Sequence, residues 1–226
     1  MSSLEHKRYA CIAALAVALL PGLGTAAEIV NGDFETGDFT GWSLDTDGFE
    51  GTAPDFQVVG VPGNHQARVE IDFGTTDFAL FANTLYQPLD LTAAPGEELV
   101  LSFEWAFAGV DGTDLDDYLV VGFSNSTGGF FNNVGDALPL LEVDSYLDNG
   151  SYSAVLADGV FNNVADWVLE FQINTGGNGF GSYLLLDNVQ ITRQEATGVP
   201  EPGLLFAPGL ALLVWASRRP SRQARN

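Results

Sequence analysis

Apolar and polar residues alternate with a period of two through most of residues 28–195, and helical periodicity is almost absent. In Leu99–Phe107 every odd-numbered position is large and apolar, and Trp167–Asn174 shows the same order with mostly polar even positions. Such alternation is typical of strands with one buried face. Weaker strand candidates are residues 56–59, 67–71, 78–81, 118–123, 152–156 and 183–192.

Turn-forming residues separate these candidates, as in Pro95-Gly96, Asp148-Asn149-Gly150 and residues 175–178. Many short strands joined by such turns predict an all-β fold, a single β-sandwich over residues 28–195. Trp105 and Trp167 occupy apolar strand positions, so we expect both in the core.

Residues 1–27 have the organisation of a secretory signal peptide. Lys7 and Arg8 precede a short apolar stretch over residues 10–20, which Pro21 and two glycines interrupt before small residues lead to Glu28. A permanent membrane anchor is the alternative, but the apolar stretch is short for a span. We therefore expect export and cleavage by signal peptidase.

A second apolar segment lies near the C-terminus, where fifteen residues separate Pro202 from Arg218. As a helix they would extend about 22 Å, against a hydrocarbon core of about 30 Å. Such a helix is a marginal permanent span but an adequate transient one, and the arginines behind it favour the cytoplasmic side.

The C-terminal arrangement resembles a PEP-CTERM sorting signal. Its three parts follow in order: the motif Pro200-Glu201-Pro202, the apolar segment, and the basic pair Arg218-Arg219. The resemblance assigns residues 196–226 to sorting and implies an exosortase-type membrane enzyme as processing partner. It also implies a location at the outer surface or outside the cell, in a setting of exopolysaccharide and biofilm. A plain C-terminal anchor, or an apolar helix packed on the body, is the alternative.

The body between the two apolar ends is strongly acidic. From residue 28 to residue 197 it has two arginines against 28 acidic residues, a net charge of −26. Such a surface repels phosphate backbones, so nucleic acid is excluded as a partner, whereas cations are attracted. Solubility alone also accounts for the charge. The chain's single cysteine, Cys11, lies in the leader, so the mature body has neither disulfides nor a thiol nucleophile.

Both ends of the body resemble those of jelly-roll domains related to carbohydrate-binding modules. The opening stretch runs from Ile29 to Glu35 and is followed by Gly41-Trp42, and the closing stretch is 185–191. The resemblance implies a galactose-binding-like jelly-roll sandwich with its first and last strands adjacent. It does not by itself establish sugar binding, since function depends on the site rather than the fold.

Asp187 is the most informative acid of the body. On a regular strand it shares a face with four other residues, so we expect it on the apolar side: Tyr183, Leu185, Val189 and Ile191. A carboxylate there is costly unless paired or bound to metal. In the resembling modules the corresponding acids help hold a structural calcium ion, which implies Ca²⁺ ligands at Glu35 and Asp187. Hydrogen bonds from backbone amides, or from Arg193, are the alternative for Asp187.

Two loops share a motif: Phe131-Asn132-Asn133 recurs thirty residues later as Phe161-Asn162-Asn163. Asn readily forms turns, so two similar turns are one interpretation. The other is a pair of sugar-binding loops, with Phe for stacking and Asn for hydroxyl recognition.

The body has few of the side chains that commonly act in catalysis: it contains one histidine, His65, and no lysine or cysteine. We expect His65 at the surface and no enzyme activity. The leading hypothesis is an exported, non-catalytic surface or matrix protein that binds carbohydrate. An acidic structural envelope protein without a defined ligand is the second hypothesis, and a carboxylate-based hydrolase is the third.

Overall fold

The computed structural model describes residues 29–46, 54–71, 82–108, 117–144, 147–161, 166–174 and 181–196. The predicted signal peptide and the sorting residues Pro200, Glu201, Pro202, Arg218 and Arg219 lie outside these ranges. So do Asn162, Asn163 and the strand candidate 78–81. Within the described ranges, no helix has the length and apolar character of a membrane span.

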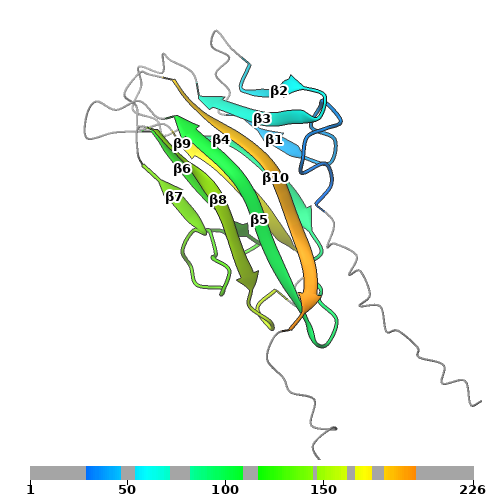
Figure 1. Ribbon diagram of the computed structural model, residues 1–226. Helices are drawn as coiled ribbons and strands as arrows, with labels where there is room; N and C mark the ends of the chain where they lie inside the picture. The colour runs from blue at the N-terminus through cyan, green and yellow to red at the C-terminus, as the bar shows by residue number, and fades with distance from the viewer. Residues whose placement is uncertain are drawn as a thin grey trace, which may run out of the picture.

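The described chain forms two five-stranded antiparallel sheets packed face to face (Figure 1). The front sheet has the order β2-β3-β10-β5-β8 and the back sheet the order β1-β4-β9-β6-β7. The strands are β1 (Ser43–Asp45), β2 (Phe56–Val61), β3 (Asn64–Ile71), β4 (Ala82–Leu89), β5 (Glu97–Ala108), β6 (Tyr118–Ser124), β7 (Leu141–Val143), β8 (Leu147–Leu156), β9 (Trp167–Asn174) and β10 (Ser182–Glu195). This jelly-roll sandwich confirms the predicted all-β fold.

The core lies between the sheets and is built from the alternating apolar positions. In β9 the buried and half-buried residues alternate without a break, as its sequence predicts. The ring of Phe103 in β5 meets that of Phe171 in β9 edge to face, with centroids 5.1 Å apart. Such aromatic contacts join the two sheets and add to the gain from burial.

The face of β10 changes at a β-bulge. The register against β5 shifts between Asp187 and Gln190, and Asn188 adopts the left-handed region with φ of 52°. Leu184 and Leu186 are buried before the bulge, and Val189 and Ile191 after it. Asp187 therefore shares a face with Tyr183 and Leu185, as predicted, but not with Val189 and Ile191, because a bulge inserts a residue and reverses the alternation. The shared face is the outer one, so the predicted inward orientation was wrong, although Asp187 is buried, at 9% exposure.

The opening stretch forms turns rather than a strand. The N–H of Val189 in β10 donates to the carbonyl oxygen of Gly32 at 2.9 Å, so the opening turn adjoins β10. A Cβ at Gly32 would lie 1.9 Å from the Val189 oxygen, so this approach requires glycine. The first strand, β1, pairs with β4 in the back sheet. The expected adjacency of first and last strands was therefore wrong, since the opening turn takes that place.

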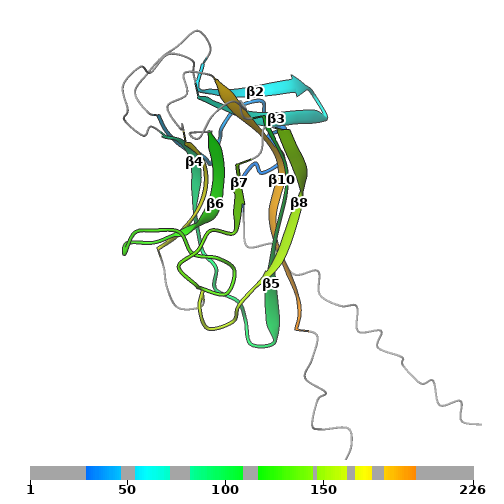
Figure 2. The same cartoon turned by 90° about the vertical axis from the view of Figure 1, so that its left-hand side faces the viewer.

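The β2–β3 hairpin curls away from the rest of the front sheet. Figure 2 shows it extending beyond β5, β8 and β10, on the side away from the back sheet. The outer surface of the front sheet therefore has a raised margin along β3, formed by the strong right-handed twist of the strands.

Candidate functional site

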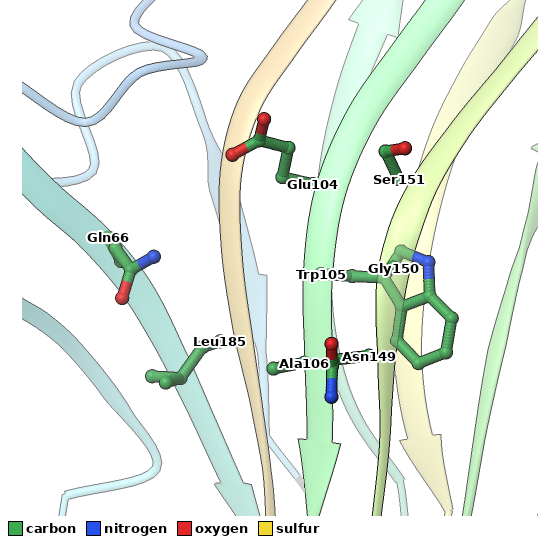
Figure 3. Close-up of a pocket in the computed structure, with 8 residues that line it drawn as sticks. All are labelled: Gln66, Glu104, Trp105, Ala106, Asn149, Gly150, Ser151 and Leu185. Carbon is green, nitrogen blue, oxygen red and sulfur yellow. The ribbon is translucent and has the colours of Figure 1, made fainter.

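A hollow of about 400 Å³ lies on the front sheet, between the curled β3 and the edge strand β8 (Figure 3). We call it the front hollow. Its lining comes from four strands and consists of two amides, one carboxylate, one hydroxyl, one indole and small or apolar residues: Gln66, Glu104, Trp105, Ala106, Asn149, Gly150, Ser151 and Leu185.

Strand pairing places the polar groups of the hollow on one face. Glu104 in β5 pairs with Asp187 on one side and with Ser151 on the other. Two residues further along β5, Ala106 pairs in the same way with Leu185 and Asn149. Residues directly opposite in antiparallel strands share a face, so these side chains are on the outside. Their neighbours in β5, Phe103 and Phe107, are buried inside. The alternation of β5 therefore builds the core and the hollow together.

Trp105 packs against the core, as expected, but less completely than Trp167. Its side chain is half-buried, whereas Trp167 is 4% exposed. Trp105 pairs with Gly150 of the edge strand, and a Cβ at Gly150 would lie 3.6 Å from the indole Nε1 atom. Trp105 and Gly150 both line the hollow, and the indole extends beside this glycine in Figure 3.

The front hollow is electrically negative. Glu104 is exposed, and its Oε2 atom accepts a hydrogen bond from the Asn188 side-chain amide at 3.1 Å. Burial raises the pKa of the nearby Asp187 carboxyl, and the charges of Glu104, Glu35 and Asp33 raise it further.

Both arginines of the body are already engaged by other groups. Arg68 pairs with Glu70 at 2.8 Å and lies over the ring of Tyr183. Arg193 donates to the carbonyl oxygen of Thr92 at 2.7 Å and lies 3.5 Å from Glu97. Neither arginine therefore pairs with the acids around the hollow.

Glu35 joins the opening turn to the β2–β3 hairpin. Its carboxylate accepts hydrogen bonds from the backbone N–H groups of Gly63 at 2.6 Å and His65 at 2.8 Å. These two bonds hold the pKa of Glu35 below its usual value, and the bond from His65 has the larger effect. The Nδ1 atom of the half-buried His65 lies 3.4 Å from Glu35 Oε2. The acid therefore steadies the hairpin that supplies Gln66 to the hollow.

The predicted calcium ligands, Glu35 and Asp187, are close enough for one charge to raise the pKa of the other. Asp187 Oδ1 accepts the backbone N–H of Asn188 at 2.7 Å, which is the backbone-amide alternative considered for this residue. Within the described ranges, no three His, Cys, Asp or Glu side chains gather in a metal-binding group. Ca²⁺ prefers oxygen ligands and accepts backbone carbonyls, so these acids fit the ion chemically if carbonyls complete its shell. Calcium at Glu35 and Asp187 stays a prediction.

The two motif loops direct their aromatic rings toward the core. Phe161 is 2% exposed and packs on Phe123 and Trp167, with centroids 4.8 Å from each. Phe131 is half-buried against Trp167.

The asparagine side chains of the first loop form hydrogen bonds with nearby backbone groups. Asn132 Oδ1 accepts the N–H groups of Val134 and Asp136, and Asn133 Nδ2 donates to the Val155 carbonyl. In the described part of the loops, these residues therefore hold the turn rather than offer a sugar-stacking surface.

A second hollow, of about 330 Å³, lies where the opening turn meets the bulge of β10. Asn31, Asp33, Asn188 and Gln190 provide its polar groups. Because Asn188 lines this hollow and also bonds to Glu104, the two polar surfaces adjoin.

Comparison with known proteins gives no match to any family model or curated protein. Among solved structures, the chain is similar to the carbohydrate-binding module TmCBM61 in complex with β-1,4-galactotriose, with 15% identity, a TM-score of 0.45 and coverage of 75% of this chain and 99% of that one. It is also similar to the non-crystalline-cellulose-specific module CBM28, with 16% identity, a TM-score of 0.43 and coverage of 75% of this chain and 96% of that one. A Stig cyclase from Fischerella sp. TAU has 18% identity, a TM-score of 0.43 and coverage of 76% of this chain and 99% of that one. At this similarity the likeness identifies neither a family nor a ligand.

Proposed function

We propose that the body binds carbohydrate in the front hollow. The observation that carries this proposal is the placement of planar amides, a hydroxyl and a carboxylate around one hollow that Trp105 also lines. Gln66 and Asn149 each offer both donors and acceptors, which is what the hydroxyl groups of a sugar require. Trp105 offers an apolar aromatic surface for the C–H face of a pyranose ring.

The extent of the polar surface favours an oligosaccharide over a single sugar. The front hollow and the second hollow adjoin at the hydrogen bond between Glu104 and Asn188. A chain of sugars lying along β10 would contact both. Binding without hydrolysis is the activity that we propose, since the body also lacks lysine and cysteine and has one histidine.

We further infer that the body acts outside the cytoplasm as a surface or matrix protein, with exopolysaccharide as its partner. The charge layout supports this inference, because six of the eight basic residues flank the two apolar ends while the body has 28 acids. Signal peptidase and an exosortase-type enzyme would remove these ends. Calcium held by Glu35 and Asp187 would stabilise the exported body.

A glycan array at fixed calcium, followed by calorimetry on the best ligand, tests the binding proposal. We expect Trp105→Ala to weaken binding by about tenfold, because it removes an aromatic stacking surface. Tyr86→Ala is the matched control: this half-buried aromatic residue faces outward from β4 in the back sheet. Loss of binding in Tyr86→Ala alone would place the ligand on the back sheet and contradict the proposed site.

Two other results would contradict the function itself. If no glycan on the array binds, the chain is better described as an acidic structural protein of the envelope. If incubation with polysaccharide releases sugars, and Glu104→Gln stops the release, the protein is a hydrolase.

A further inference from the structure

We infer that the front hollow selects sugars with free amino groups, in their protonated form, over neutral and acidic sugars. The inference rests on the proposed carbohydrate binding and names the class of sugar. It follows from the position of Glu104 and the charges around it.

Glu104 is placed to meet a ligand. Its side chain is exposed on the central strand β5 and lines the hollow. Asn188 donates to its Oε2 atom and so fixes the orientation of the carboxylate. Figure 3 shows the carboxylate standing free of the lining side chains around it. An ammonium group in the hollow would form a charge-assisted hydrogen bond with this carboxylate.

In the part of the chain that the structure describes, no protein cation offsets Glu104. Arg68 and Arg193 are paired with Glu70 and Glu97, as described above. Asp187 pairs with Glu104 across β10 and β5, and Asp33 lines the adjoining second hollow, so further carboxylates surround Glu104. A calcium ion on Glu35 and Asp187 would neutralise those two charges and leave Glu104 and Asp33 negative.

The same charges disfavour an acidic sugar. Such a sugar would meet the Glu104 carboxylate in the hollow, and the body's charge of −26 would repel it from a distance.

Calorimetry with three oligosaccharides of equal length and β-1,4 linkage tests this selection: glucosamine, N-acetylglucosamine and glucose oligomers. At low salt and about pH 6, where the amine is protonated, we expect the glucosamine oligomer to bind about fivefold more tightly than the neutral two. Salt should reduce this difference, because it screens exposed charges.

Glu104→Gln should abolish the preference while the neutral oligomers still bind. Glu142→Gln is the matched control, since it removes an exposed acid from β7 of the back sheet and should leave the preference intact. Melting temperatures of both variants establish that they fold. Trp105→Ala should weaken all three oligomers.

The outcomes separate the inference from the proposed function. Equal binding of all three oligomers overturns the inference and leaves carbohydrate binding standing. Absence of binding by every oligomer and by every glycan on the array overturns both. Preference for glucosamine that persists in Glu104→Gln and in Trp105→Ala reflects attraction to the acidic surface as a whole, and also overturns the inference.

Discussion

The carboxylate of Glu35 accepts the backbone N–H of Gly63 at 2.6 Å and thereby fastens the opening turn to the tip of the β2–β3 hairpin. A second bond from the N–H of His65 completes the clamp. The hairpin supplies Gln66, so an acid in the opening turn shapes the front hollow without lining it. The same residue, predicted as a calcium ligand, therefore has a positioning role that needs no metal.

Glu35→Gln should lower the melting temperature at neutral pH, because two charge-assisted hydrogen bonds become weaker. The sign of the pH dependence follows from the lowered pKa of Glu35. A depressed carboxyl pKa stabilises the fold above the unfolded-state pKa, and this contribution is lost as the pH falls through the folded-state pKa. The wild type should therefore lose more stability in acid than the variant does.

Thermal melts of Glu35→Gln between neutral and acidic pH measure this difference, with Glu142→Gln as the control for removal of one exposed charge. A variant curve parallel to that of the wild type would show that the clamp does not contribute.

Asp187→Asn tests the electrostatics around the bulge. The pKa of Asp187 is raised, first by burial and then by Glu104, Glu35 and Asp33. A raised carboxyl pKa means that the ionised form destabilises the metal-free fold as the pH rises through that pKa. In chelator at neutral pH, the Asn variant should therefore melt at a higher temperature than the wild type.

Added calcium should reverse that order. We expect it to raise the melting temperature of the wild type and to leave Asp187→Asn unchanged, because the variant lacks the charge that holds the ion. A wild-type midpoint that is identical in calcium and in chelator would remove the calcium prediction.

Gly150→Ala tests the access of a ligand to the indole. The new methyl group would lie 3.6 Å from the Trp105 Nε1 atom, an ordinary contact, and would cover part of the ring. Binding should weaken by about three- to tenfold. Stability should hold or rise by up to about 1 kcal/mol, since alanine restricts the unfolded chain. The matched change Ser153→Ala, on the exposed part of β8, should leave affinity unaltered.

The strand pattern predicted the core well because burial repeats every second residue. Trp167 and Phe171 in β9 lie where that period places them. Trp105 obeys the same period but pairs with a glycine on an edge strand, and this pairing cannot be read from β5 alone. A tryptophan and a distant glycine become neighbours only through strand register.

The remaining errors have similar causes. The bulge at Asp187 arises where Asn188 adopts a positive φ, a local choice that alternation does not reveal. The opening and closing motifs implied adjacent first and last strands, which was wrong. Gly32 in the opening turn bonds to Val189 of β10, while β1 joins the other sheet.

The mass of the mature protein recovered from cells tests export. We expect the loss of residues 1–27 and cleavage close to Pro200-Glu201-Pro202, with any additional mass reporting an attached anchor. Recovery of the intact 226-residue chain from the cytosol would contradict the surface role.

The central claim is that carbohydrate binds at Trp105, and nitrogen-resolved NMR of the indole groups tests it most directly. The body has three tryptophans, of which Trp42 and Trp167 are buried in the core. Titration with the best glycan should shift the Trp105 indole signal, together with the side-chain amide signals of Gln66 and Asn149. If those signals stay fixed while the backbone amides of β4 and β9 move, the ligand occupies the back sheet and the account is contradicted.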